Sequence, residues 1–460
     1  MGGKAAMLLV LRFSLIFLVF GNNFNNLSTR SVENNTNYYV HNISHNIALA
    51  GANIASNKVF MDKTWDAGYE DLTYQGGIIN VYVTNPTGGS SKVKVCHKYG
   101  THAQHTISVA ASAVPALLAQ GDALGDCSGS GYEPEMVVIY SEGIYQGDTS
   151  VVYVELQPST FAKYGNFYDK MASAIPATGD VFNGPFHVND KMVTWGSPEF
   201  FGKVTSKKGL QMLGTKDPIF HGGYESGVDV ERPFDTTGMR MAGLYGGMVL
   251  KDTTGAGNSI DVEVTFNNKI VDFRYKINDG LNTWSPTKNV KLSDFNGMMY
   301  VEKGNVFVKG TIDGKATIVA SKKGKSGCGN IYQTDDIKYK DDISKNPDSD
   351  NMLGLVAEEN IRLQYNADTK GHDIITQASM FASNGDIGPE DALVTNDHIL
   401  SEWQILGGLI AHDVRVTAHY NSVGPYEGYK FIHTYDERFL HTVPPFFPHT
   451  KNYEVVSWYE

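Results

Sequence analysis

Residues 5–20 read AAMLLVLRFSLIFLVF and form the only long, almost wholly apolar run of the chain. As a helix, these sixteen residues would span roughly 24 Å, somewhat less than the ~30 Å hydrocarbon core of a bilayer. The run fits a cleaved signal peptide, a membrane anchor, or a leader whose apolar helix stays on the mature protein. Because Phe20 is followed by Gly21, Asn22 and Asn23 instead of a small-residue cleavage site, the sequence favours retention of the helix.

A second helical pattern follows an Asn-rich polar stretch. Its apolar residues recur mostly at steps of three and four, which is the spacing of an amphipathic helix with a narrow seam. Small residues beside the seam would let another element approach closely. That element is either the sheet of the same domain or a helix of a partner subunit. The seam residues are Val40, Ile43, Ile47, Ala50, Ile54 and Met61, and the small residues are Ala48, Gly51, Ala52 and Ala55.

The rest of the chain has the composition of a turn-rich β protein, with 48 Gly, 25 Tyr and 22 Phe among 460 residues. Residues 76–160 contain short β-branched and aromatic runs bounded by turn residues, as expected of a small antiparallel sheet. From residue 176 onward, apolar strands alternate with Gly or Asn corners, which predicts the stacked rungs of a right-handed β-helix. A β-sandwich is the alternative, because it would give similar strands.

We therefore predict a mainly β fold with a long N-terminal apolar and amphipathic helix. The predicted regions are an N-terminal membrane or filament helix (1–62), a small α+β sheet domain (63–175), a β-helix-like domain (176–435) with an insertion around 210–290, and a C-terminal wrapping tail (436–460).

Charge and cysteine content limit the classes of partner and site. The net charge of −12, from 38 Lys and Arg against 50 Asp and Glu, argues against nucleic acid as a partner. The three cysteines have none of the spacings of zinc or redox motifs. If this part of the chain lies outside the cytoplasm, Cys96 and Cys127 could form a disulfide and leave Cys328 unpaired. Three structural thiols are the alternative.

Several stretches resemble known envelope proteins. The segment HNIALAGANIASNKVFMDKTW (45–65) resembles the helix of PilX-like type IV minor pilins. The segments GPFHVNDKMVTWGSPEFFGKV (184–204) and YDERFLHTVPPFFP (435–448) resemble uncharacterised bacterial envelope proteins that join a pilin-like N-terminus to a β-rich domain. The resemblance implies a pilin-like subunit of the cell envelope, either anchored in the inner membrane or incorporated in an extracellular filament.

The start of the apolar run also resembles a prepilin leader, in which a Gly precedes Phe-Thr-Leu-Ile-Glu and cleavage occurs before the Phe. The matching residues here are Phe13, Ser14, Leu15 and Ile16, whereas Arg12 stands in place of the Gly and Phe17 in place of the Glu. An Arg inside a bilayer costs about 3 kcal/mol on insertion scales, and cleavage before Phe13 would remove it. An uncleaved anchor is the alternative.

An enzyme with a β-helix fold would need acidic and basic groups on one strand face. In a strand, Asp413 and Arg415 share one face opposite His412, which favours a surface ion pair. Neighbouring Gly or Asn residues mark Asp180 and Asp190 as turn residues. The two groups considered are Asp180, His187 and Asp190, and His412, Asp413 and Arg415.

We predict no catalytic residues and no cofactor, with one candidate site for calcium. The loop KDDISKNPDSDN gathers several carboxylates, which calcium favours on irregular backbone, although an acidic solvated loop is the alternative. The carboxylates are those of Asp341, Asp342, Asp348 and Asp350.

These observations predict a non-catalytic subunit that takes part in the assembly of a type IV pilus or secretion filament, or in adhesion. The expected partners are other pilin-like subunits, the inner membrane, and surface polysaccharide or a host or neighbouring cell. The alternative function is a secreted β-helix lyase or hydrolase that acts on carbohydrate. The residues predicted to form the assembly helix are Phe13, Leu15, Val40, Ile43, Ile47, Ala50, Gly51 and Ile54.

Overall fold

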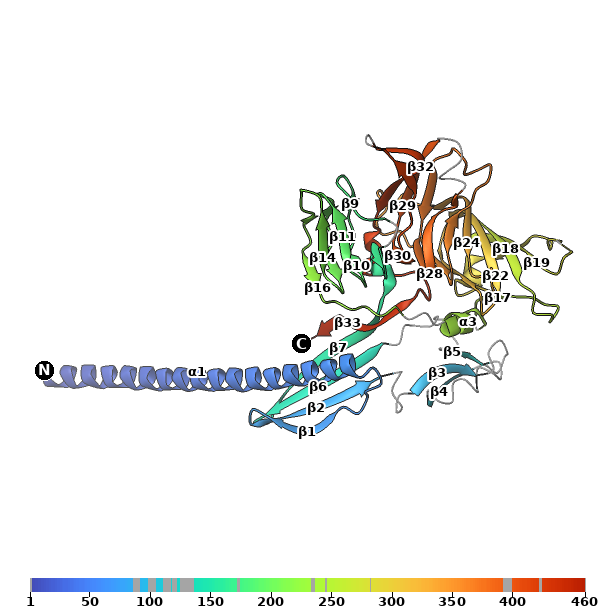
Figure 1. Ribbon diagram of the computed structural model, residues 1–460. Helices are drawn as coiled ribbons and strands as arrows, with labels where there is room; N and C mark the ends of the chain where they lie inside the picture. The colour runs from blue at the N-terminus through green and yellow to red at the C-terminus, as the bar shows by residue number, and fades with distance from the viewer. Residues whose placement is uncertain are drawn as a thin grey trace.

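The computed structural model describes residues 2–85, 92–97, 105–110, 117, 122–124, 136–171, 174–232, 236–244, 246–281, 283–391, 399–421 and 424–459. A straight N-terminal helix projects from a body of β-sheets (Figure 1). One sheet lies along the C-terminal part of this helix, and a larger stacked β region lies beyond that sheet (Figure 1). The prediction of a mainly β fold with a long N-terminal helix is confirmed.

Helix α1 runs without a break from Gly2 to Met61. It contains no proline, so no residue lacks the N–H that continues the backbone hydrogen bonds of the helix. The Asn-rich segment 22–37 lowers helix propensity but does not end the helix. Directly after Met61, the Asp62 N–H donates to the Lys58 carbonyl at 2.7 Å, and the chain then leaves the helix.

The sheet beside α1 is antiparallel and is built from two distant parts of the chain. Its strand order is β1-β2-β6-β7-β33, so the last strand of the chain completes a sheet begun by the first. Inward and outward residues alternate along β2 and β6, as in a sheet with one buried face. The strands are β1 (Tyr69–Tyr74), β2 (Gly77–Thr84), β6 (Val137–Tyr145), β7 (Asp148–Thr160) and β33 (His449–Tyr459).

A second small sheet has the order β4-β3-β5 and contains Cys96 on β3. Cys127 lies outside the described residues, so the predicted Cys96–Cys127 disulfide does too. Cys328 is a free, buried cysteine. Burial raises the pKa of its thiol. The strands are β3 (Lys92–His97), β4 (His105–Ala110) and β5 (Ala123–Leu124).

The larger region contains a long ladder of parallel strands. Along most of this ladder, a strand pairs with a strand from the next turn of the chain, for example Phe186 with Val204 and Val204 with Tyr224. In order along the ladder, the strands are β17 (Met248–Leu250), β21 (Met298–Glu302), β23 (Lys315–Ser321), β25 (Met352–Ala357), β28 (Ser379–Pro389), β30 (Leu409–Asp413), β8 (Asn166–Tyr168), β10 (Phe186–Val188), β13 (Val204–Ser206) and β16 (Tyr224–Ser226).

The chain does not fill this ladder from one end to the other. It enters in the middle at β8, proceeds to β16, and then begins again at the opposite end with β17 after helix α3 (Thr236–Leu244). The second passage ends at β30, which pairs with β8 in parallel. The two passages are therefore joined by the pairing of strands more than two hundred residues apart in the sequence.

A second parallel ladder lies beside the first and shares strand β28 with it. Its inward side chains, such as those of Val262, Val306 and Ile331, pack with inward side chains of the first ladder in the largest buried apolar cluster of the described residues. The strands are β18 (Ile260–Asn268), β22 (Gly304–Ile312), β24 (Ile331–Tyr339), β26 (Ile361–Leu363), β27 (Ile374–Gln377), β29 (Leu400–Leu406) and β32 (Pro425–Thr434), with β31 (Ala418–Tyr420) antiparallel to β32.

Short parallel sheets form the remaining sides of the first passage, which runs from β8 to β16. Phe182, Phe200 and Phe220 occupy equivalent positions on β9, β12 and β15, and their rings stack at centroid distances of 4.9 and 5.2 Å. Stacked identical side chains in successive turns indicate that each turn buries its interior only against its neighbours. These strands are β9 (Val181–Phe182), β12 (Glu199–Phe200), β15 (Ile219–Phe220), β11 (Met192–Trp195) and β14 (Leu210–Leu213).

The parallel pairings fit the predicted stacked rungs and do not fit a β-sandwich, whose sheets are antiparallel. The specific right-handed β-helix stays a prediction. Residues 210–290 are not a simple insertion, because β14, β16 and β18 in this range all pair in parallel with strands of the ladders. Among the described residues of this range, only β19 (Ile270–Ile277) and β20 (Lys288–Lys291) form an antiparallel extension at the edge. The stacked region also begins at Asn166, before the predicted boundary at 176.

The C-terminal segment crosses the stacked region and then returns to the sheet beside α1. Phe439 and Phe447 are fully buried, and the Pro445 carbonyl accepts a hydrogen bond from the Thr317 hydroxyl. Strand β33 then pairs with β7, which itself leads into the stacked region through a short helical turn at Phe161–Lys163. The sheet beside α1 and the stacked region are thus connected by two adjacent strands.

Candidate functional site

The first half of α1 is an apolar helical surface that no other part of the described chain covers. Apolar side chains between Met7 and Phe20 are between about half and three-quarters exposed; Phe17, for example, is 72% exposed. Between residues 5 and 29, Arg12 is the only charged residue. The helix is long and apolar enough to cross a membrane, by length and composition. Phe13 and Leu15, two of the predicted assembly residues, lie on this exposed surface.

The second half of α1 is buried against its own sheet. Its inward face consists mainly of small residues, and it packs across β2, β6 and β7. A β-carbon added to Gly51 would lie 2.4 Å from the Ser141 Oγ and 2.6 Å from the Ile79 Cγ2. The helix therefore lies too close to the sheet for a larger residue at this position. The Ser141 hydroxyl donates to the Ala48 carbonyl at 2.8 Å in the same contact. The buried face comprises Ser44, Ile47, Ala48, Gly51, Ala52, Ala55, Ser56 and Val59.

This face differs from the predicted seam. Ile47 and Gly51 are buried as a packing seam requires, but Ile54 is 38% exposed and Met61 is more exposed still. Val40, Ile43 and Ala50 are partly buried at the margin. The face is centred on the small residues because only they allow the backbone of the helix to approach the sheet. The element that covers Ile47 and Gly51 is the sheet of the same chain, which was one of the two alternatives.

Polar contacts fix both ends of the buried half. At its start, the Asp148 carboxylate contacts His41 Nδ1 at 3.2 Å and accepts a hydrogen bond from the Ser44 hydroxyl. The hydrogen bond from Ser44 lowers the pKa of Asp148, and His41 acts in the same direction. At its end, the buried Asn85 amide donates to the carbonyls of Lys63 and Trp65 at 3.0 and 2.9 Å.

The structure does not bring the first group of candidate catalytic residues together. His187 is buried, stacks on Phe167, and has its two ring nitrogens engaged by Thr205 and Asn189. Burial lowers the pKa of His187. Asp190 instead forms a surface ion pair of 2.8 Å with Lys208.

The second group is divided in a similar way. His412 Nδ1 lies 3.1 Å from the Asp169 carboxylate, which also binds Arg232. Burial acts to raise the pKa of Asp169, but its bonds with Arg232 outweigh burial and lower it. Arg415 forms ion pairs with Asp386 and Asp391. Sequence reasoning did not find Asp169 or Arg232, because their partners are far away in the chain.

Three of the four carboxylates of the candidate calcium loop have separate partners. Asp342 pairs with Lys345 at 2.8 Å, which lowers its pKa to about 2, and Asp350 pairs with Lys315 at 2.8 Å. Asp341 accepts a hydrogen bond of 2.7 Å from Ser349. Within the described residues, which include Asp348, no group of three or more His, Cys, Asp or Glu residues could hold a metal ion.

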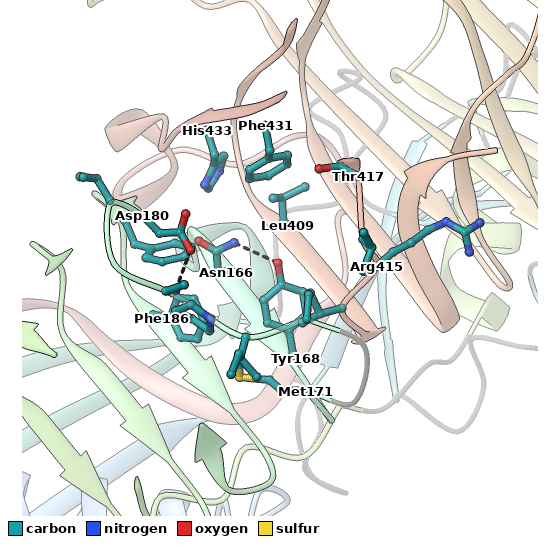
Figure 2. Close-up of a pocket in the computed structure, with 18 of the residues that line it drawn as sticks. Asn166, Tyr168, Met171, Asp180, Phe186, Leu409, Arg415, Thr417, Phe431 and His433 are labelled. Atoms are coloured by element: carbon teal, nitrogen blue, oxygen red, sulfur yellow. Dashed lines mark hydrogen bonds between the residues drawn. The ribbon is translucent and has the colours of Figure 1, made fainter. Parts of the chain in front are cut away.

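A cavity of about 740 Å³ lies where the two passages of the chain meet, beside the pairing of β30 with β8. Its walls come from β8, β10 and residues 174–183 on one side and from β30, β32 and residues 414–420 on the other. Figure 2 shows that the carboxyl group of Asp180, the amide of Asn166 and the ring of His433 gather at one end of this cavity. Of these three residues, only Asp180 was singled out from the sequence.

No protein-family model matches the chain, and no curated protein matches it. Among solved structures, the chain is similar to the competence-associated pilin ComZ from Thermus thermophilus, with 12% sequence identity and a TM-score of 0.33. The match covers 91% of this chain and 97% of the ComZ chain. A TM-score of this size carries no argument about fold or function, so the geometry of the chain itself supports the proposals that follow.

Proposed function

We propose that this protein is a pilin-like subunit of a cell-envelope filament. Its first helical half is held in the inner membrane before assembly and packs among the equivalent helices of other subunits afterwards. The β domains are displayed outside the membrane. The observation that carries the proposal is the division of one continuous helix into an exposed apolar half and a half fixed to its own sheet.

The exposed apolar surface needs a partner that excludes water. Exposed apolar area costs roughly 25 cal/mol per Å², and the side chains from Met7 to Phe20 surround the whole helix instead of forming one stripe. A helix that is apolar on all sides is suited to a lipid bilayer or to a bundle of similar helices. Either environment fits a filament subunit.

The polar segment 22–37 then acts as a spacer. It is helical and exposed, and it separates the apolar run from the residues that contact the sheet. At 1.5 Å per residue, it holds the β domains roughly 24 Å from the end of the apolar run. Because the spacer is part of a continuous helix, it fixes the position of the displayed domains relative to the membrane or the filament core.

The finer assignment as a minor pilin of the PilX-like type comes from the sequence resemblance of residues 45–65. The same resemblance supports processing before Phe13 and a role in pilus or secretion-filament assembly or in adhesion. The absence of a catalytic role is also part of the proposal. The separate partners of His187, Asp190 and Arg415 support it over the alternative of a secreted carbohydrate-active enzyme.

Arg substitutions in the two exposed segments of α1 test the proposal. Leu18→Arg places a second charge in the apolar run and should reduce recovery in membranes and sheared filaments by about tenfold or more. Asn26→Arg, the matched control in the polar spacer, should be recovered like the wild type. Resistance of the β domains to protease should stay unchanged in both variants.

Equal recovery of Leu18→Arg and wild type would contradict the proposal, as would release of the wild-type chain to the medium without its apolar run. The N-terminal residue of the mature protein, measured by mass spectrometry, distinguishes the two forms of the proposal. A start at Phe13 supports prepilin-type processing, and an intact apolar run preceded by Lys4 supports an uncleaved anchor.

A further inference from the structure

The face of the five-stranded sheet that points away from α1 carries a row of tyrosines. Tyr82 on β2 lies directly opposite Tyr140 on β6, which lies opposite Tyr153 on β7. Tyr153 in turn lies opposite Tyr459 on β33. Val81, the neighbour of Tyr82 in its strand, is buried in the cluster that includes α1, so the tyrosines lie on the other face. We call these four residues the tyrosine row.

Most of the tyrosine row is exposed to solvent. Tyr82, Tyr140 and Tyr459 are 59%, 37% and 63% exposed. The ring centroids lie 6.2 Å apart in the pair Tyr82–Tyr140 and 6.0 Å apart in the pair Tyr153–Tyr459. Aromatic pairs across strands stabilise a sheet, but this contact leaves much of the ring surface in water. Tyr is concentrated in protein interfaces because it offers a large, rigid contact area at a small entropic cost.

Two carboxylates lie beside the tyrosine row on the same face. Glu142 follows Tyr140 by two positions on β6, and Glu155 follows Tyr153 by two positions on β7. The Ser457 and Tyr153 hydroxyls donate to the Glu155 carboxylate, and these hydrogen bonds lower its pKa and keep it ionised. Glu142 is partly exposed. The sequences of β1, β2, β6 and β7 contain no Lys or Arg, so this face is negative.

A partner that complements this face carries positive charge. The π faces of the rings attract cations, and a guanidinium group can stack on a ring while it binds a neighbouring carboxylate. The chain itself has a net charge of −12, so a second copy matches the face less well than a basic protein does.

We propose that the tyrosine row is a docking surface for an extended basic segment of another protein. Its Arg or Lys side chains lie on the rings, beside Glu142 and Glu155. In an extended chain, the side chains on one face repeat every ~6.8 Å. This repeat is close to the measured ring separations of 6.2 and 6.0 Å. The surface lies on the opposite side of the sheet from α1, so the proposal does not depend on filament assembly.

Isothermal titration calorimetry on the full-length protein in a non-ionic detergent tests the proposal. The probes are a short peptide of alternating Arg and Ser, the same peptide with citrulline in place of Arg, and maltohexaose. Citrulline keeps the shape of Arg without its charge. We expect the Arg peptide to bind at least about tenfold more tightly than the citrulline peptide, and added salt to weaken it.

A pair of tyrosine variants locates the binding. Tyr140→Ser removes a central ring of the row and should weaken binding of the Arg peptide about fivefold. Tyr426→Ser is the matched control, because Tyr426 is 41% exposed on β32 and its ring lies 6.2 Å from that of His419. This control should bind like the wild type. Tyr140→Phe keeps the ring and should also bind like the wild type.

A pair of glutamate variants tests the charge. Glu142→Gln should weaken binding of the Arg peptide about threefold. Glu437→Gln removes the same charge from an exposed position in the stacked region and should leave the affinity unchanged. Because both variants change the net charge equally, a difference between them reports the position of the carboxylate and not the overall charge of the protein.

Weaker binding by Tyr140→Ser than by Tyr426→Ser would support the proposal once melting temperatures show that both variants are folded. If Tyr140→Ser is unfolded, weaker binding by Glu142→Gln than by Glu437→Gln supports the same conclusion. The proposal is overturned if the Arg peptide does not bind, if the citrulline peptide binds equally well, or if variants of the row bind like their controls. Binding of maltohexaose alone, or self-association that Tyr82→Ser abolishes in the ultracentrifuge, would also overturn it.

Discussion

The two halves of α1 belong to one continuous helix, but they differ in the kind of side chain they carry and in whether it is buried. The first half carries large apolar residues and leaves them exposed, whereas the second half buries a face made mainly of Ala, Ser and Gly. Residue size therefore separates the exposed apolar half of the helix from the half that fits closely against the sheet. Hydrophobicity alone would have assigned the tighter packing to the wrong half.

The largest effect is expected for Ile47→Asp, which is compared with Ile54→Asp as its control. Ile47 is fully buried against the sheet, so an unpaired carboxylate there should lower the free energy of unfolding of this domain by about 4 kcal/mol. Ile54 is 38% exposed on the side away from the sheet, so Ile54→Asp should change the free energy of unfolding by no more than about 0.5 kcal/mol. Urea unfolding followed by circular dichroism measures both. Similar losses in the two variants would show that the helix packs with a different face.

Two glycines of the helix, Gly51 and Gly21, provide the second test. Gly51→Leu should cost about 3 kcal/mol, because the new side chain overlaps Ser141 and Ile79. Gly21→Leu meets no atom within 4 Å of the new β-carbon and replaces a poor helix former, so the β domains should melt at the wild-type temperature. Thermal melting of both variants under the same conditions is the measurement. A normal melting temperature for Gly51→Leu would contradict the close approach.

A smaller effect is expected at the exit of the buried half. Asn85→Ala leaves the carbonyls of Lys63 and Trp65 without their side-chain donor and should cost about 1–2 kcal/mol. Asn53→Ala is the control, because the Asn53 amide only donates to a carbonyl on the exposed side of the helix. The measurement is the urea concentration at the midpoint of unfolding of each variant. An unchanged midpoint for Asn85→Ala would mean that water replaces the amide at no cost.

The smallest expected effect is a pH dependence at the entry to the buried half. The pKa of Asp148 is lowered in the folded state, mainly by the Ser44 hydroxyl. Its contribution to stability is therefore present above the unfolded value of 3.8 and is lost as the pH falls through the lower folded value. Asp148→Asn should be less stable than the wild type at pH 6, and the difference should shrink progressively as the pH falls below 3.8. Glu142→Gln, on the neighbouring strand, is the control, and a difference that does not shrink below pH 3.8 would refute the linkage.

The sequence predicted the helix and the β class correctly because both depend on local patterns. The apolar run and the spacing of residues 40–61 are visible in the order of side chains alone, and so is the alternation along strands such as Ile260–Asn268. The exact face of the helix was not predictable in the same way. Large residues such as Ile54 dominate a hydrophobic pattern, whereas the sheet selects Ala48 and Ala52, which permit close approach.

The cavity was not predictable from the sequence because no local pattern joins its walls. Asn166 and His433 become neighbours only because β30 pairs with β8. Neither residue lies in a motif, and their unpaired atoms are visible only when the surrounding contacts are known. Asp180 could be singled out as a polar residue at a turn, but its sequence context gave no sign of the other two.

The position of β33 has a consequence for the order of events during synthesis. Ser457 on this strand donates to the Glu155 carboxylate, 302 positions earlier, and the strand forms an edge of the sheet that holds α1. While the ribosome is still making the stacked region, β7 has an unpaired edge, and such edges invite pairing with other chains. The sheet that holds α1 can be completed only after β33 has been synthesised, so a chaperone that shields the edge of β7 until then would protect the chain from pairing with other chains.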